Sequence, residues 1–212
     1  MTAVVVIAKE CLPGRVKTRL QPEFTAEEAA AIASAALVDT LGVAGSLPAS
    51  RFILYFDGAM PPPGAAGWEL LPQPAGGLDE RIAALFDMLD EPVLLVGMDT
   101  PHADPAALAD VFADDSATDA WFGPATDGGF WALALRRPDG ALVRGIPMST
   151  DRTGAHQLQR LRAAGLRVRL LPPLTDIDTA ADVPAAALGA PALARTLAAL
   201  RPAGVLARQV LV

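Results

Sequence analysis

Residues 3–20 read Ala3-Val4-Val5-Val6-Ile7-Ala8-Lys9-Glu10-Cys11-Leu12-Pro13-Gly14-Arg15-Val16-Lys17-Thr18-Arg19-Leu20. The first six residues are apolar on both sides, as expected of a strand buried inside a parallel sheet. A Pro-Gly turn with four cations follows this strand at once; the cations are Lys9, Arg15, Lys17 and Arg19. In open α/β sheets, ligands bind beyond the carboxyl ends of the strands. The stretch therefore predicts an α/β fold with a binding loop after its first strand.

The charge of this loop contrasts with the charge of the chain. The 212 residues carry a formal net charge of −7. A local group of cations on an acidic protein favours a compact polyanion, such as the phosphates of a nucleotide. A nucleic acid would need a broad basic face, so we expect no nucleic-acid partner.

Strand-like and helix-like segments alternate along the rest of the chain. Predicted strands cover residues 3–8, 51–56, 68–71, 92–97, 120–122, 130–135 and 168–171. Predicted helices run from the capping box Thr25-Ala26-Glu27-Glu28 to near Gly45, and over 78–89, 105–112, 153–164, 180–188 and 192–200. This βαβ alternation predicts a GT-A-like or Rossmann-like three-layer α/β sandwich around a mostly parallel, mixed sheet. We expect residues 1–212 to form one domain, with the tail 205–212 as an edge strand, a packing arm or a homodimer contact.

Composition indicates the compartment. Hydrophobic residues make up 52% of the chain, and Cys11 is its one cysteine, so no internal disulfide can form. A lone cysteine fits a reducing compartment. The apolar run at residues 3–8 is too short for a signal peptide, and no apolar stretch is expected to reach the roughly 20 residues of a membrane span. We expect a cytoplasmic protein without a membrane span.

The opening loop is the first candidate site. Gly14 allows close approach to a phosphate, Pro13 stiffens the turn, and Lys17 and Arg19, which flank Thr18, can neutralise phosphate oxygens. The alternative is a solvated basic loop. The loop is not a P-loop, because the pattern G-x-x-x-x-G-K-[ST] is absent from the sequence.

Carboxylates follow two further strands. Asp99, in Gly97-Met98-Asp99-Thr100-Pro101, directly follows the strand at 92–97 and is a natural ligand for Mg²⁺ or Mn²⁺. It could instead cap the following turn, whereas Asp104 suits the N-cap of the next helix. In Asp176-Ile177-Asp178-Thr179, alternation places both carboxylates on one side and buries Ile177. The alternative is that Asp178 or Thr179 caps the helix that follows.

Three glycine-rich or polar loops complete the set of candidates. Asp127-Gly128-Gly129 permits a tight turn that exposes backbone N–H groups to a substrate, or it is only a hairpin turn. The loop from Gln73 to Gly76-Gly77 opens a helix and could bind a base or an anion, or it could be only a flexible entry with Arg81 as a salt-bridge partner. The polar loop around Ser149 could contact an acceptor.

The ordered set of these motifs resembles a known bacterial family. The order is A-K-x-x-x-P-G-R-V-K-T-R-L, then G-x-D-x-P, then G-P-A-x-D-G-G-F-W, then D-I-D-T, and it spans residues 4 to about 182. The chain resembles a family of GT-A-fold, nucleotide-diphospho-sugar transferase-like proteins labelled as glycosyltransferases of undefined activity. It is similar, more distantly, to the guanylyltransferases of coenzyme F420 synthesis and to molybdenum-cofactor nucleotidyltransferases.

The resemblance implies a role for each candidate. The loop residues Lys9, Pro13, Gly14, Arg15, Lys17, Thr18 and Arg19 would hold the nucleotide phosphates, and Gln73, Gly76 and Gly77 would lie near the base. Asp99 and Asp178 would bind Mg²⁺ or Mn²⁺. Asp127, Gly128, Gly129 and Ser149 would face the acceptor or sugar, with Lys17, Arg19 and Asp127 catalytic.

Two reactions fit this set of residues. In glycosyl transfer, a nucleotide sugar gives its sugar to a small-molecule acceptor; in nucleotidyl transfer, an NTP gives its NMP to a phosphorylated or carboxylate acceptor and releases pyrophosphate. The family label favours the first reaction. The single Asp99, where many GT-A glycosyltransferases carry D-x-D, and the cationic loop favour the second. A nucleotide-binding module without catalysis is a third reading.

Overall fold

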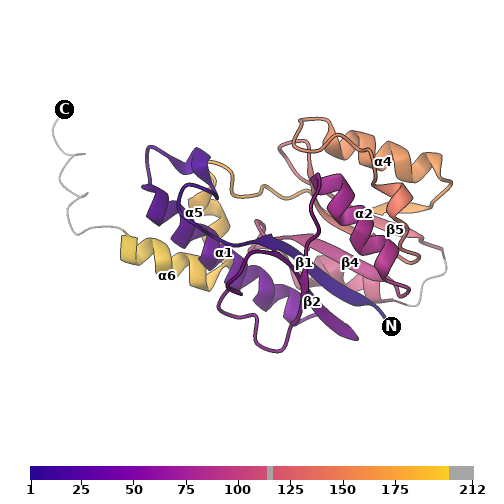
Figure 1. The fold of residues 1–212 in the computed structure, drawn as a ribbon, viewed down its shortest axis with the longest axis horizontal. Helices are drawn as coiled ribbons and strands as arrows, with labels where there is room; N and C mark the ends of the chain where they lie inside the picture. Colours follow the sequence, from indigo (N-terminus) through magenta and orange to yellow (C-terminus); the bar gives the residue numbers. More distant parts are fainter. Residues whose placement is uncertain (114–116, 201–212) are drawn as a thin grey trace.

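A computed structural model of the protein describes residues 1–113 and 117–200 (Figure 1). The predicted tail at 205–212 lies outside the described residues. The strands are β1 Ala3–Lys9, β2 Arg51–Asp57, β3 Glu69–Pro72, β4 Val93–Gly97, β5 Ala120–Pro124, β6 Phe130–Leu135 and β7 Val168–Leu170. The α-helices are α1 Ala26–Gly45, α2 Leu78–Met88, α3 Pro105–Leu108, α4 Thr153–Ala163, α5 Val183–Ala186 and α6 Pro191–Leu200. Short 3₁₀ helices are η1 Thr18–Leu20, η2 Ala109–Phe112, η3 Gly140–Leu142 and η4 Ala187–Gly189.

The strands form one seven-stranded sheet in the order β3-β2-β1-β4-β6-β5-β7. β1 pairs in parallel with both β2 and β4, and among the described strands β6 runs against its two neighbours, β4 and β5. The chain thus builds outward from β1 to β3 and then returns to place β4 on the other side of β1. This reversal is a topological switch point, where a crevice opens beyond the carboxyl ends of the strands. The crevice lies between Lys9, the last residue of β1, and Gly97, the last residue of β4.

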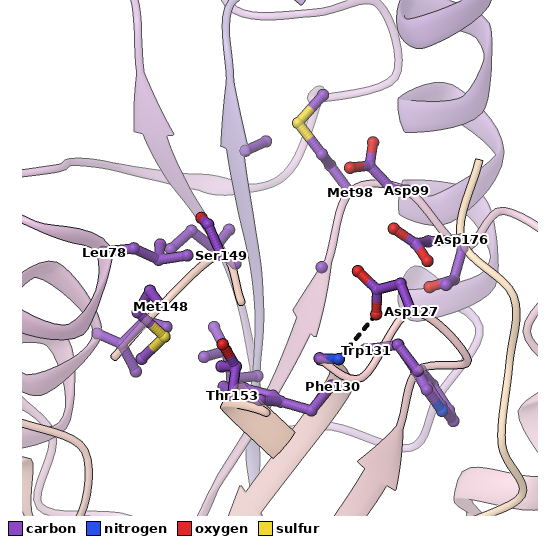
Figure 2. A pocket seen from close by; sticks show the side chains of 18 of the residues that line it. Leu78, Met98, Asp99, Asp127, Phe130, Trp131, Met148, Ser149, Thr153 and Asp176 are labelled. Atoms are coloured by element: carbon purple, nitrogen blue, oxygen red, sulfur yellow. Dashed lines mark hydrogen bonds between the residues drawn. The ribbon is translucent and has the colours of Figure 1, made fainter. Parts of the chain in front are cut away.

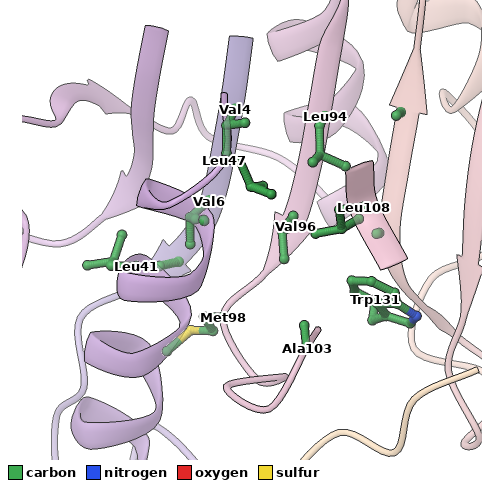
Figure 3. Close-up of a cluster of buried hydrophobic side chains, with 14 of the residues drawn as sticks. Val4, Val6, Leu41, Leu47, Leu94, Val96, Met98, Ala103, Leu108 and Trp131 are labelled. Carbon is green, nitrogen blue, oxygen red and sulfur yellow. The ribbon is translucent and has the colours of Figure 1, made fainter. Parts of the chain in front are cut away.

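Alternate residues of the central strands face opposite layers of helices. Val4 and Val6 of β1 face α1, where they meet Leu41 and the β4 residues Leu94 and Val96 (Figure 3). All five side chains are almost completely buried. Burial of each such side chain contributes roughly 1.5–3 kcal/mol to folding, so this layer fixes α1 on the sheet.

The opposite face of the sheet is covered by α2 and α4. Val5 of β1 and Tyr55 of β2 pack against Phe86 of α2, and Leu161 of α4 belongs to the same buried cluster. A third buried cluster lies on the far side of α1. It contains Ile32 of α1, Ile177 of the D-I-D-T motif and Leu193 of α6. The third cluster brings the C-terminal segment, with its D-I-D-T motif, next to the N-terminal loop.

The three-layer sandwich and the mostly parallel, mixed sheet confirm the predicted fold class. The predicted capping box is present: Thr25 Oγ1 accepts from Glu28 N–H at 3.2 Å, and Glu28 Oε2 accepts from Thr25 N–H at 2.7 Å. The predicted helix over 105–112 divides into α3 and η2. Asp104 caps α3 as predicted, because its Oδ1 accepts from Ala106 N–H at 2.9 Å.

The helix predicted over 180–188 starts later than the sequence indicates. The segment 180–188 is helical only from Val183, and Asp182, not Asp178 or Thr179, stands at its N-cap. The Asp182 carboxylate instead accepts from the backbone N–H groups of Asp178 and Thr179. The alternative considered for Asp178 and Thr179, that one of them caps this helix, is therefore wrong, because Asp182 stands at the N-cap and its carboxylate holds the turn before the helix.

One helix of the described chain is long and apolar enough to cross a membrane by length and composition. It is α1, with a mean hydropathy of 1.3 over its most apolar window, and 61% of that window is buried within the structure. The expectation from sequence is that no apolar stretch reaches the length of a membrane span, but α1, with 20 residues, does reach it. Its contacts with both the sheet and the α6 layer account for its apolar composition.

Candidate functional site

A cleft at the switch point contains two connected cavities. The outer chamber, of about 630 Å³, is bordered by the opening loop and by Asp178. The inner chamber, of about 460 Å³, lies over the ends of β1 and β4 and reaches Gln73, Asp127 and Asp176. The residues that line both chambers are Lys9, Leu78, Met98, Asp99, Asp127, Ser149 and Thr150. The crevice that the topology creates is therefore continuous, with Asp99 at the junction of its two parts.

Two ion pairs occupy the outer chamber. Lys17 Nζ lies 2.9 Å from Asp99 Oδ2, and Arg19 Nη1 lies 2.5 Å from Asp178 Oδ2. Two of the four predicted phosphate-binding cations, Lys17 and Arg19, thus each pair with one predicted metal-binding carboxylate. The pairs differ in exposure: the Lys17 side chain is 9% exposed and that of Arg19 is 75% exposed. Solvent screens the second pair much more than the first.

Local backbone geometry places these charges. Lys17 adopts a left-handed conformation with φ of 48°, immediately before η1, and this turns its side chain toward Asp99. Its ammonium also donates to the backbone carbonyl of Ile177. Ile177 is completely buried, as predicted, and its N–H donates to the Asp99 carbonyl at 3.2 Å. A single buried residue therefore holds the D-I-D-T motif against both the opening loop and the end of β4.

The inner chamber combines apolar walls with carboxylates. Asp99, Asp127 and Asp176 point toward one another on one side of this chamber, and Leu78 and Met148 lie on the other side (Figure 2). Burial raises the pKa of Asp176, and the neighbouring carboxylates of Asp127 and Asp99 raise it further. An increase from these causes indicates that a cation or a hydrogen-bond donor at this place would be favoured.

The residues at the junction fit a divalent cation. Asp99 Oδ1 is a buried oxygen without a hydrogen-bond partner, and Asp99 Oδ2 already binds a positive charge, the Lys17 ammonium. In the described part of the chain, no group of three or more His, Cys, Asp or Glu side chains could hold a metal ion. Mg²⁺ is usually held by one or two carboxylates together with waters and substrate phosphates. The donor set therefore fits an ion that arrives with a phosphorylated ligand.

The Asp-Gly-Gly turn has a packing role that the sequence does not reveal. Gly128 has a φ of +91°, and a Cβ atom there would lie 2.0 Å from the carbonyl oxygen of Asp151. Gly154 N–H donates to the Gly128 carbonyl at 2.7 Å, and Asp127 Oδ1 accepts from Gly129 N–H at 2.8 Å. Gly128 thus brings the turn into direct contact with the start of α4. Gly129 and Asp127 remain on the wall of the inner chamber.

Gln73 borders the inner chamber, but its amide is used within the fold. Its Nε2 donates to the carbonyls of Ala8 and Tyr55, each at 2.8 Å, and its Oε1 accepts from Arg81 at 3.2 Å. Arg81 also forms an ion pair with Asp57 at 2.8 Å, which is the salt-bridge role considered for it. Gly76 and Gly77 form the entry of α2 and are not among the residues that line either chamber.

The remaining candidates of the opening loop divide into two groups. Thr18 and Lys9 border the outer chamber, whereas Pro13, Gly14 and Arg15 are exposed and border neither chamber. Gly14 has a φ of +71°, a left-handed conformation that favours glycine, with open space around the position of a Cβ atom.

Ser149 and Cys11 lie at the edge of this region. Ser149 has a positive φ of 58° and contributes to both chambers. Burial, and then the Asp99 carboxylate, raises the pKa of the Cys11 thiol to about 11, so this group stays neutral at physiological pH.

Asp176 and Thr100 are polar residues of the inner chamber that were not among the predicted site residues. Asp176, the first carboxylate of the D-I-D-T motif, borders the inner chamber, whereas the predicted ligand Asp178 borders the outer one. Thr100 is 2% exposed, borders the inner chamber, and has a hydroxyl without a hydrogen-bond partner. The spacing of the motif identified both carboxylates, but it could not show that they contribute to different chambers.

Solved structures with the same fold show which class of protein this architecture defines. A protein from Desulfovibrio desulfuricans G20, described as a "putative nucleotide-diphospho-sugar transferase", is 25% identical, with a TM-score of 0.71 over 84% of this chain and 82% of that chain. CMP:2-keto-3-deoxy-manno-octonic acid synthetase in complex with CTP is 14% identical, with a TM-score of 0.56 over 89% of this chain and 98% of that one. The inositol-1-phosphate CTP transferase of T. maritima is 12% identical, with a TM-score of 0.52 over 92% and 95%. The chain therefore shares its fold with these transferases.

The family follows from the sequence itself. Residues 43–150 match the family DUF2064, described as "Uncharacterized protein conserved in bacteria", and the chain belongs to this family. A comparison with curated proteins finds no match. The matched segment includes β4, Asp99 and the Asp-Gly-Gly turn, which form the junction and one wall of the inner chamber.

Proposed function

We propose that the protein is a metal-dependent transferase that uses a nucleotide substrate at this cleft. The observation that carries the proposal is the pairing of Lys17 with Asp99 and of Arg19 with Asp178 at the switch point of the sheet. A metal-bound phosphate group is itself a pair of opposite charges. When such a group exchanges with these ion pairs, Lys17 and Arg19 would bind the phosphate oxygens, and Asp99 and Asp178 would hold the metal ion.

Each residue has a distinct role in this exchange. Lys17 and Arg19 bind phosphate oxygens and stabilise the charge that develops on the leaving group. Asp99, whose Oδ1 is buried without a hydrogen-bond partner, and Asp178 would hold Mg²⁺ or Mn²⁺. The bound metal ion neutralises phosphate charge. Lys9 and Thr18 border the same chamber and provide further phosphate contacts.

Two transfer reactions are compatible with these roles. In glycosyl transfer, the acceptor attacks the anomeric carbon of a nucleotide sugar, the bond to the β-phosphate oxygen breaks, and Asp127 accepts the proton of the acceptor. In nucleotidyl transfer, an acceptor oxygen attacks the α-phosphorus of an NTP and pyrophosphate leaves. Lys17 and Arg19 favour the second reaction because two cations suit a triphosphate, and the family resemblance favours the first.

The proposal is tested in two stages with the full chain. A thermal-shift screen with NTPs and NDPs, each with and without Mg²⁺, measures stabilisation by the nucleotide. Mg²⁺-dependent stabilisation is expected, and its absence for every nucleotide would refute the proposal. Incubation with NTPs or nucleotide sugars and a panel of acceptors then separates the reactions, because acceptor-dependent pyrophosphate indicates nucleotidyl transfer and acceptor-dependent NDP indicates glycosyl transfer. Binding without turnover over the panel would indicate a non-catalytic binding module.

A further inference from the structure

The two chambers of the cleft differ in how their charges are balanced. In the outer chamber, Lys17 and Arg19 neutralise Asp99 and Asp178. In the inner chamber, neither Asp127 nor Asp176 forms an ion pair with any residue that the structure describes. The inner chamber therefore carries negative charge that no ion pair neutralises. Burial raises the pKa of Asp176 and the Lys17 ammonium lowers it in part, but the ion pair of Lys17 is with Asp99.

The cations nearest to the inner chamber do not remove this charge. Arg81 is held by the Asp57 carboxylate, by Gln73 Oε1 and by the Gly76 carbonyl. Lys9 borders both chambers, at the end of β1, and is the one cation that a ligand in the outer chamber shares with the inner one. A phosphate chain in the outer chamber would engage Lys9 and leave Asp127 and Asp176 without a counter-charge.

The other walls of the inner chamber suit a ligand with an apolar face and hydroxyl groups. Leu78, Ile82, Phe130 and Met148 form much of the lining. The Thr100 hydroxyl, almost completely buried and without a partner, borders the same cavity and can donate or accept one hydrogen bond. This observation is independent of the carboxylates, and it indicates that a polar group of a ligand belongs in the chamber.

We propose that the inner chamber binds the part of the substrate that lies beyond its phosphates, and that this part is a hydroxylated group without negative charge, either neutral or cationic. The inference rests on the proposed function, since the nucleotide must hold its phosphates in the outer chamber for the linked group to reach the inner one. Hydroxyl or ammonium groups donate hydrogen bonds to Asp127 and Asp176. A carboxylate or a second phosphate there would be desolvated beside two like charges.

The test uses a matched series of nucleotide sugars on the full chain with Mg²⁺. The nucleoside diphosphate that stabilises the protein most is chosen, and dissociation constants are measured by calorimetry for it and for its glucose, glucosamine and glucuronate derivatives. The glucuronate derivative is expected to bind at least tenfold more weakly than the glucose derivative, and the glucosamine derivative equally or more tightly. Equal or tighter binding of the glucuronate derivative, or binding of all three within threefold, would overturn the inference.

Variants test whether Asp127 and Asp176 cause the weaker binding of the glucuronate derivative. Asp127→Asn and Asp176→Asn should each reduce the penalty for glucuronate by threefold or more. For Asp176→Asn, affinity for the nucleoside diphosphate alone should stay within threefold, because Asp176 borders the inner chamber and not the outer one. Asp104→Asn is the matched control, because Asp104 caps α3 outside both chambers and asparagine is an equally good N-cap. A penalty that is unchanged in both cleft variants would overturn the inference. If no nucleoside diphosphate binds with Mg²⁺, the proposed function itself fails, which is a separate result.

Discussion

The outer and inner chambers share Asp99, but they differ in how many of their carboxylates form ion pairs. In the outer chamber, Lys17 and Arg19 form ion pairs with Asp99 and Asp178, and a metal-bound phosphate can exchange with these pairs. Asp127 and Asp151 also border this chamber. The inner chamber holds Asp127 and Asp176 without ion pairs among the described residues, beside apolar walls. We therefore expect the outer chamber to bind the phosphates of any nucleotide, and the inner chamber to select the group that is attached to those phosphates.

Replacing the shared residue should have the largest effect. Asp99→Asn removes the negative charge at the junction, and we expect Mg²⁺-dependent nucleotide affinity to fall by about 100-fold, or about 2.7 kcal/mol. Calorimetry with and without Mg²⁺ measures this change, with Asp104→Asn as the control. Because the buried Lys17 ammonium loses its partner, unfolding by urea is followed on the same samples. Retained metal-dependent affinity in a folded variant would show that Asp99 is not the metal ligand.

A change at the turn between β5 and β6 should have the next largest effect, on the stability of the fold. Gly128→Ala places a methyl group 2.0 Å from the Asp151 carbonyl, at a φ of +91°, and should lower the free energy of unfolding by about 2 kcal/mol or more. The measurement is urea unfolding. Gly145→Ala is a matched control, because Gly145 has a similar φ of +79° but nothing within 4 Å of the added Cβ atom. Equal losses in the two variants would show that the close contact with Asp151 does not matter.

Lys17→Met separates the two charges of the buried ion pair. The variant loses a phosphate contact, so nucleotide affinity in Mg²⁺ should fall about tenfold. It also frees Asp99 from a competing cation, so the affinity for Mn²⁺ alone should rise. Calorimetry measures both quantities. A parallel fall in both affinities would argue that Lys17 positions Asp99 and does not compete with the metal.

Arg19→Gln should give the smallest effect. The Arg19 side chain is 75% exposed, and exposed ion pairs contribute roughly 0–1 kcal/mol, so nucleotide affinity should fall by about threefold or less at low salt. The loss should shrink further as ionic strength rises toward about 0.5 M. The control is Arg195→Gln, which removes one exposed positive charge from α6, outside both chambers. A loss as large as that of Lys17→Met would mean that Arg19 turns inward when nucleotide binds.

Much of the architecture could be predicted because buried strands are apolar at consecutive positions of the sequence. The run from Val4 to Ala8 is apolar at every position because both faces of β1 are covered by helices, and the same holds for β4. The apolar run of β4 ends at Gly97, so the sequence also predicts that Asp99 lies just beyond this strand.

The helix predicted over 180–188 begins only at Val183. Alanine has high helix propensity wherever it occurs, so Ala180 and Ala181 favoured an earlier start. Asp182, however, holds the preceding residues in a turn.

The candidate residues were predictable as types, but not as partners. The sequence by itself determined where strands end and which of those ends carry cations, carboxylates or glycines, since these depend on neighbouring residues. Only the tertiary structure decided that Lys17 contacts Asp99, that Asp176 and Asp178 contribute to different chambers, and that Gly128 serves contact with Asp151. The physical reason is that each of these contacts depends on the register of the sheet and on the packing of α1, α4 and the D-I-D-T segment around it. These join residues that no local pattern relates.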